Sequence, residues 1–561
     1  MATIQSLPTE LLLKILRTAA HEAQEKWIRY LLDNPKPVRE YTYVGPIGVP
    51  QLKPRKRTPD DPQPAPALMV TLAQVCRRWC DVTLAHAILW AHVDVRDEAG
   101  TAAVLQRAGT QPLTVTFRLP DTEHDAAARS APGTRTDLFK KVLESYIGRI
   151  DTLVMPLLPE LQVTQFASVA TNLRRLLLIE PSPSLIALQI TEAPLLTHSA
   201  FPALTTIVCR TPLWAPLTHL CVPTLTTLEL FRNTPPPMED VYEVDEDYTT
   251  GLAELVRALA RMPRLEHLAV ELSEEPFDIP DTLALPKLRS LRVRAATCIC
   301  AALLRCVQPP PHVTLDFWCL YGDSGPAVCD VLALPRALAD AFANPAQFEN
   351  RFVSVRSAAL CTRPHGFSLC GWRDARALTG TNADAPPDVH IHFATAAAAE
   401  DLRTILSTMP LGDACSARIS HLFQGYGEPV LDCAKAFATV PRLERLALEC
   451  VHPCIAWELL AATPATEIFV EHVPFEWADE LWGDRAQTEH FEVQWKRTFE
   501  FSNHALEVRA VLNKRKALGL KPWVDMRGAH YHDFLQNEAE PSIYDDLLSE
   551  LLQADSSQKM V

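Results

Sequence analysis

Apolar residues recur at helical spacing close to the N-terminus. Leu7, Leu11 and Ile15 stand four residues apart, with Leu12 beside them, and this pattern predicts a short helix with a broad apolar face. Pro8 suits the first turn of such a helix, where a missing backbone N–H is tolerated. So small a helix carries more apolar surface than it can bury by itself. It is therefore predicted to pack against a partner or, as the alternative, against the core of its own chain.

A second segment repeats the pattern. Leu72, Val75, Cys76 and Trp79 are predicted to share one face of a helix, and Trp90 closes a third short segment after it. Tryptophan side chains are large, rigid anchors of the kind enriched at binding hot spots. The alternative is that both tryptophans only hold the small helical unit together.

The phrase Pro-x-Leu-x-x-Leu-x-Leu recurs, with variations, through the long middle of the chain. Copies start at positions 202, 223, 263, 286 and 441, and a related copy starts at Asn172. Their spacing is typical of leucine-rich repeats. Alternating Leu-x-Leu predicts a short strand with one buried face, and amphipathic segments at 137–149, 252–261 and 402–408 predict helices between strands. Stacking of such units closes one continuous core.

Residues 295–440 fit this phrase less well. Their best strand candidates are Val313–Phe317 and Asp388–Phe393, and residues 508–527 are interpreted as a late helix-and-strand repeat. A compact multi-domain α/β protein is the alternative architecture.

Three segments have the composition of irregular chain. Residues 33–66 carry nine prolines, which predicts a mobile, disordered loop. Its basic run Lys53–Arg57 is interpreted either as a nuclear-import signal or as a solvated stretch. Residues 234–250 are predicted to form an acidic loop, and residues 531–561 an acidic C-terminal tail.

Read in order, LPxELLxxIL, LxxVCRRW and then LW resemble an F-box over residues 4–96. The proline-rich lead-in Pro62–Pro66 resembles a large fungal set of F-box proteins, although residues 20–66 make a longer insertion than many members have. The resemblance implies docking to a Skp-type adaptor, and through it to a cullin, in a ubiquitin ligase. The adaptor-facing positions that it implies are Leu7, Pro8, Leu11, Leu12, Ile15, Val75, Cys76, Trp79 and Trp90.

The repeats at 100–530 are similar to the C-terminal leucine-rich repeats with which some F-box proteins hold substrate. The expected fold is therefore α/β: a small all-helical F-box followed by an irregular solenoid of helix–strand units with a curved parallel sheet. The expected role is that of a substrate receptor for a protein target whose identity the sequence does not reveal. A non-catalytic interaction scaffold outside any ligase is the alternative.

Net charge and composition indicate which classes of partner and which cell compartment to expect. The formal net charge of −15 disfavours nucleic acid, because phosphate binding needs a basic face. No run of about 18 apolar residues predicts a membrane span. The 15 cysteines follow no regular framework and no secretion signal precedes them. Buried free thiols in the cytosol, the nucleus or both are therefore expected.

Candidate chemistry is sparse. The sequence contains no glycine-rich phosphate loop and no Gly-x-Ser-x-Gly elbow, and no catalytic residue or cofactor is predicted. Cys298, Cys300 and Cys306 resemble half a zinc site, but core cysteines are favoured. His390 and His392 would share one strand face without an assignable third ligand. An enzyme with a dispersed site is the least favoured hypothesis.

Arginines accompany many of the repeat leucines. They are predicted to be solvated residues between buried positions, or alternatively an anion-binding surface. The set comprises Arg174, Arg175, Arg264, Arg289, Arg292, Arg442 and Arg445.

Overall fold

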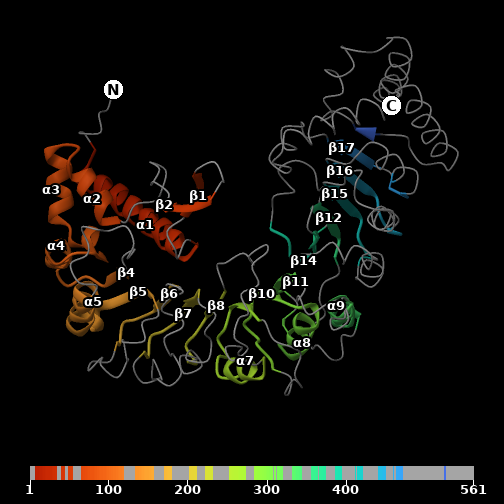
Figure 1. Cartoon of the computed structure of the whole chain (residues 1–561). Helices are drawn as coiled ribbons and strands as arrows, with labels where there is room; N and C mark the ends of the chain where they lie inside the picture. The colour runs from red at the N-terminus through yellow and green to blue at the C-terminus, as the bar shows by residue number, and fades with distance from the viewer. Residues whose placement is uncertain are drawn as a thin grey trace, which may run out of the picture. The chain divides into compact units, whose positions relative to one another are not determined.

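The computed structural model is a mixed α/β structure with a large, mostly parallel sheet and several helices (Figure 1). It describes residues 7–33, 39–44, 49–54, 65–118, 133–156, 170–179, 201–210, 222–231, 252–272, 283–307, 309–310, 312–319, 332–343, 355–363, 366–374, 386–393, 411, 413–420, 440–449, 459, 463–465, 467–471 and 524–525. The chain divides into two compact units, Met1–Val293 with Cys306–Pro309 and Arg294–Arg305 with Pro310–Val561. None of the described helices combines the length and the hydropathy needed to cross a membrane.

Helices open the first unit. They are α1 (Thr9–Asp33), α2 (Ala65–Ala73), α3 (Arg77–Ala85) and the 3-10 helix η2 (Ala87–Trp90). The first helix continues well beyond the short helix expected from the sequence and takes in part of the predicted insertion at 20–66. It continues because apolar residues at helical spacing in its second half, among them Trp27 and Leu31, are buried against the sheet.

Residues 33–66 also differ from the expected disordered loop. Strands β1 (Arg39–Val44) and β2 (Val49–Pro54) form an antiparallel two-stranded sheet. Both strands are edge strands, and a proline is tolerated at an edge because one row of backbone N–H groups is not needed for pairing. Proline density alone therefore did not exclude strands here. Of the basic run Lys53–Arg57, only Lys53 and Pro54 are described.

The described residues of the first unit continue with eight strands in chain order, of which the last ends in the second unit. They are β3 (His92–Val95), β4 (Leu113–Phe117), β5 (Ile150–Pro156), β6 (Arg175–Ile179), β7 (Thr206–Cys209), β8 (Thr227–Leu230), β9 (His267–Glu271) and β10 (Ser290–Ala295). From β3 to β9 each strand is parallel to the next. The repeated leucine phrase thus predicted real strands. Strand β3 lies inside the range 4–96 that was expected to be all helical.

Helices connect several of these strands. They are α4 (Glu98–Ala108), α5 (Gly133–Tyr146) with the 3-10 turn η4 (Ile147–Arg149), and α7 (Leu252–Leu259). The positions of α5, η4 and α7 confirm the helices predicted at 137–149 and 252–261. The side chain of Asp97 caps α4 by accepting a 2.7 Å hydrogen bond from the Gly100 amide.

The two faces of this sheet are covered differently. On one face, Leu153 of β5, Leu176 of β6 and Ile207 of β7 lie in register and are buried. Phe139 of α5 stacks on Phe117 of β4 on this face, with ring centroids 4.3 Å apart. The opposite face, which carries Val154, is covered over β5 to β7 by the second half of α1.

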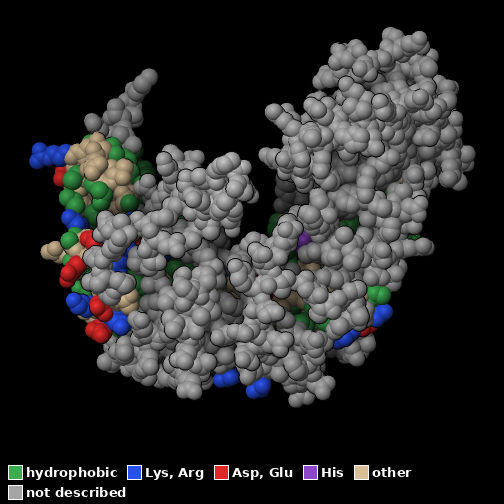
Figure 2. Space-filling view, viewed as in Figure 1, with side chains coloured by type: hydrophobic (Ala, Val, Ile, Leu, Met, Phe, Trp, Pro, Cys, Tyr) green, Lys and Arg blue, Asp and Glu red, His purple; other side chains and the backbone are tan. Residues whose placement is uncertain are grey.

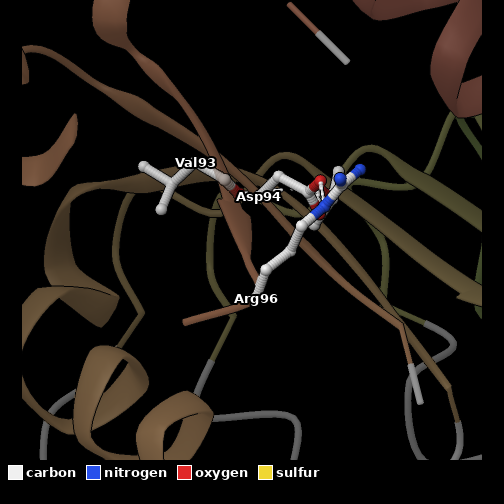
Figure 3. A network of polar contacts seen from close by, with 4 residues as sticks. Val93, Asp94 and Arg96 are labelled. Atoms are coloured by element: carbon white, nitrogen blue, oxygen red, sulfur yellow. Dashed lines mark hydrogen bonds and ion pairs between the residues drawn. The ribbon is translucent and has the colours of Figure 1, made fainter. Parts of the chain in front are cut away.

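A polar network fixes β3 to β4 where the helices end and the sheet begins (Figure 3). Asp94 accepts hydrogen bonds from Arg96 Nε and from Thr116 Oγ1, the latter at 3.2 Å. Thr116 Oγ1 also lies 3.5 Å from the carbonyl oxygen of Val93. The first strand of the sheet is thus held by side chains as well as by its backbone ladder.

The second unit contains strands in a different order. Its elements are most of α8 (Thr297–Val307), α9 (Ala333–Ala343), β11 (Thr314–Cys319), β12 (Ser357–Arg363), β13 (Gly366–Trp372), β14 (Val389–Phe393), β15 (Ser416–Ser420), β16 (Arg445–Glu449), β17 (Glu467–Glu471) and β18 (Val524–Asp525). The order across the sheet is β11-β14-β13-β12-β15-β16-β17-β18. Strands β11 and β14 confirm the two candidates predicted in residues 295–440.

The expectation of a wholly parallel sheet is wrong in this unit. Strand β13 is antiparallel to both β12 and β14. Only two residues separate β12 from β13, which is too short for the crossover that a parallel pair requires. The predicted helix at 402–408, the acidic loop at 234–250, the helix before β18 and the tail at 531–561 lie outside the described residues.

Candidate partner-docking site

The first half of α1 splits its apolar residues between two environments. Leu12 and Leu16 are fully buried, whereas Leu11 and Ile15 are 49% and 48% exposed. The first turn is closed by the Leu12 amide, which donates to the Pro8 carbonyl at 3.0 Å. The single broad face expected from spacing is thus divided into an inward and an outward half.

The second motif segment is not one helix. Helix α2 ends at Ala73, and Cys76 adopts an extended conformation before α3 begins. Val75 lies in the turn between them and is 57% exposed. Tertiary contacts account for the break, because Arg78 at the start of α3 donates hydrogen bonds to the Leu7 carbonyl and, at 3.4 Å, to Thr9 Oγ1.

The two tryptophans are interior residues of the helical unit. Trp79 and Trp90 are 8% and 3% exposed. Trp90 Nε1 donates to the Thr83 carbonyl at 2.8 Å, and the Arg107 guanidinium lies over the Trp90 ring. The alternative interpretation, in which they hold the unit together, therefore describes their packing better than exposure to a partner does.

The nine sequence-predicted positions thus fall into three groups. Pro8, Leu11, Ile15 and Val75 are exposed, Leu7 and Cys76 are half-buried, and Leu12, Trp79 and Trp90 are buried. The three buried residues cannot contact a partner in this structure, because their side chains form the core of the helical unit that carries the exposed residues. Helical periodicity cannot separate these groups, since both sides of the motif are apolar.

Sequence reasoning missed further exposed apolar side chains on the same helices. Val70 of α2, Leu84 of α3 and Ile88 of η2 are 47%, 48% and 36% exposed. Apart from Trp318, every large exposed hydrophobic residue in the described chain belongs to α1–α3, the turn between α2 and α3, or η2. Figure 2 shows hydrophobic side chains gathered at this end of the molecule. Exposed apolar surface of this kind marks interaction sites.

The second half of α1 packs onto the sheet instead of facing outward. Trp27, Ile28, Leu31 and Leu32 form one buried cluster with Val154, Leu177, Ile179 and Val208 of β5, β6 and β7. The outward residues of the first half and this cluster belong to one uninterrupted helix. The helix therefore fixes the exposed apolar residues relative to the sheet of the first unit.

Charged side chains also lie at the contact between α1 and the sheet. Arg175 of β6 donates to both carboxylate oxygens of Glu25, at 2.8 and 3.3 Å. Burial by itself raises the pKa of Glu25, but the hydrogen bonds and charge of Arg175 outweigh it, so that this pKa is lowered. The carboxylate of this α1 residue thus stays charged.

His92 of β3 lies under the same helix. Its Nδ1 is shielded from solvent and has no hydrogen-bond partner among the described residues. Burial, with a smaller contribution from the nearby His21, lowers the pKa of His92 to about 4, although Glu25 opposes the shift. At neutral pH this imidazole is uncharged, as burial demands.

Three of the seven repeat arginines pair with an acid on the preceding strand segment. Ion pairs join Arg174 to Asp151, Arg289 to Glu266 and Arg442 to Asp413. These pairs, together with Arg175–Glu25, favour the interpretation of the arginines as solvated residues between buried positions, and they disfavour an anion-binding surface. Each exposed pair contributes little stability.

The candidate metal ligands do not converge within the described residues. No group of three or more His, Cys, Asp and Glu side chains there is arranged to hold a metal. Cys300 and Cys306 are buried in α8, as expected for core cysteines. His390 and His392 do share a strand face, and the carboxylate that the sequence could not assign to them is Asp316, whose Oδ1 lies 2.8 Å from His390 Nδ1.

Comparisons with known proteins add no assignment. None of the protein-family models searched matches the chain, and none of the curated proteins compared with it matches.

Proposed function

We propose that this protein is the substrate receptor of a Skp–cullin–F-box ubiquitin ligase, and that it binds the Skp-type adaptor through the helices α1, α2, α3 and η2. The observation that supports this most is the exposure of Leu11, Ile15 and Val75 at motif positions. They stand on a helical unit whose interior is already filled by Leu12 and Trp79.

The proposed contact is apolar packing between helices of the two proteins. Burying the exposed half of a leucine or isoleucine side chain contributes roughly 1 kcal/mol. Three such residues contribute roughly 3 kcal/mol, which is less than the roughly 4–15 kcal/mol that association costs, so the contact must also bury other residues of these helices, such as Val70 and Ile88. The buried cluster of α1 with β5–β7 holds α1 in place before binding, which lowers that cost.

In this proposal the chain contributes no catalytic residue of its own. The cullin would bring a charged conjugating enzyme, and the sheet would hold a protein target close to it. The rate would then rise because the effective concentration of target lysines near the conjugating enzyme is high. The site of action would be the cytosol, the nucleus or both.

A capture experiment tests the adaptor contact. Purified Skp-type adaptor is incubated with the immobilised full chain and with the variant Leu11→Asp. Stoichiometric capture by the wild type and at least tenfold weaker capture by the variant are expected, because a carboxylate would have to be desolvated in the contact. Leu11 is half exposed in the free chain, so Leu11→Asp is expected to leave the fold intact.

Leu84→Asp is the matched control, because it introduces the same group at a leucine of nearly equal exposure outside the motif positions. It should retain most of the capture. Equal loss in both variants would mean that any exposed apolar residue on these helices matters, and not the motif positions. Trp79→Ala is unsuitable as a probe because Trp79 is a core residue.

Absence of capture by the wild type would favour the alternative, a non-catalytic scaffold. Val70, Leu84 and Ile88 give that alternative some support, since they extend the exposed apolar surface beyond the motif positions.

A further inference from the structure

Trp318 is the one large exposed hydrophobic residue that the described chain carries outside the N-terminal helices. It is 38% exposed, whereas its neighbours Phe317 and Cys319 point to the other face of β11 and are fully buried. Tryptophan is enriched at binding hot spots, where a partner covers the ring.

Strand register places Trp318 in a compact group on one sheet face of the second unit. Trp318 lies opposite His392 of β14, which lies opposite Ser368 of β13. One step along the strands, Asp316 lies opposite His390, which lies opposite Cys370. The imidazoles of His390 and His392 lie 6.1 and 4.8 Å from the Trp318 ring, centroid to centroid.

Hydrogen bonds fix the orientation of these rings. Asp316 Oδ1 accepts from Trp318 Nε1 at 3.0 Å and lies 2.8 Å from His390 Nδ1. His392 Nδ1 lies 3.0 Å from Ser368 Oγ. An exposed aromatic group that is already held in place loses little entropy when it binds a partner.

The group offers hydrogen-bond acceptors to a partner. The Asp316 carboxylate takes the proton-bearing side of the His390 ring, so in the neutral imidazole Nε2 presents a lone pair. No hydrogen-bond partner for this Nε2 is found among the described residues, and the side chain is 24% exposed. The Trp318 ring adds an electron-rich face.

We propose that Trp318, His390 and the carboxylate of Asp316 form a binding site for an arginine side chain of a protein partner. A guanidinium carries only donors and stacks on aromatic faces, so it can donate to His390 Nε2 while its plane lies on the indole. None of the six residues in the group is a lysine or arginine, and the chain as a whole has a formal charge of −15, which attracts a basic segment.

The idea that this site recognises the target of a ubiquitin ligase rests on the proposed function. The idea that the site binds arginine does not rest on it, and it is tested without the adaptor. A ligase that binds its target elsewhere would capture the adaptor but would not bind the arginine peptide at this site. An arginine-binding scaffold would bind the peptide but would not capture the adaptor.

The test uses the full chain labelled with 5-fluorotryptophan and fluorine NMR, with the Trp318 resonance assigned from the variant Trp318→Phe. The probe is the peptide acetyl-Gly-Ser-Arg-Ser-Gly-amide, and its control contains citrulline, the neutral isostere of arginine. A saturable shift of the Trp318 resonance is expected with arginine, and binding about tenfold weaker with citrulline. No shift with the arginine peptide, or an equal shift with citrulline, would overturn the proposal.

Two charge-matched variants separate the site from general attraction to an acidic protein. Asp316→Asn removes the charge that orients both rings, and it should weaken binding of the arginine peptide about fivefold or more. Glu444→Gln removes the same charge from an exposed position near β16 and should leave binding unchanged. Equal weakening in both variants would show that the peptide senses only net charge.

Discussion

Individual side chains between α1 and the sheet show what burial does to charge. Glu25 and Arg175 are 150 positions apart in sequence yet form a two-point hydrogen-bonded pair, and His92 lies close enough to sense the same carboxylate. The acid keeps its charge because an arginine compensates for its desolvation, whereas the histidine has no such partner and stays neutral. The two groups therefore respond to pH in different ranges.

His92 should make the stability of the first unit depend on pH. Its pKa is about 4 in the folded chain and 6.5 when exposed, so between these values the unfolded chain binds more protons. Stability should therefore fall as the pH is lowered from 6.5 to 4, by roughly 3 kcal/mol in all. Urea unfolding of the wild type and of His92→Gln at several pH values measures this.

The variant should lose most of the pH dependence above pH 5, where Glu25 does not yet titrate because its pKa is lowered. Identical pH profiles for His92→Gln and the wild type would show that other groups cause the loss.

The two halves of helix α1 lie in different environments. Its first half exposes Leu11 and Ile15, and its second half buries Trp27 and Leu31 against three strands. A helix in water gains most of its stability from packing one apolar face, so the buried half supports the exposed one. Helix continuity through residues 20–33 is therefore a consequence of the sheet beneath it.

Leu31→Ala should test this support. The side chain is 1% exposed within the cluster on β5–β7, so truncation should cost about 2–5 kcal/mol of unfolding free energy. Leu11→Ala, a truncation of the same residue type on the same helix, should change stability by no more than about 0.5 kcal/mol. Chemical denaturation measures both, and equal effects would contradict the division of α1 into outward and inward halves.

For the molecule as a whole, the parallel ladders keep most backbone contacts between neighbouring strands. Each inner strand bonds to two others, so a local defect should loosen its neighbours more than distant strands. The predicted leucine-rich architecture shares this property, although β13 reverses direction within the second unit.

Ile391→Ala, in the fully buried centre of β14, should reveal this locality. Amide hydrogen exchange should become faster in β11, β13 and β14, because these strands are directly paired. Exchange in β5 and β6 should stay close to that of the wild type. Uniform acceleration throughout both units would show instead that the chain unfolds as one cooperative block.

The sequence alone determined where about half of the described strands and several of the helices lie. Leu-x-Leu spacing predicts strands because alternation with period two is a local property of extended chain, and the repeated phrase located β6 to β10 and β16. Periodicity likewise located the start of α1 and the helices α5 and α7. These features depend on residues close together in the chain.

Only the tertiary structure decided which apolar residues face outward, where helices end and how strands pair. Leu11 and Leu12 are the same residue type one position apart, and packing alone exposes one and buries the other. The break before α3, the length of α1 and the pairing of His390 with Asp316 depend on contacts between distant segments. Local spacing carries no information about such contacts, because each residue's environment is set by the segments that fold against it.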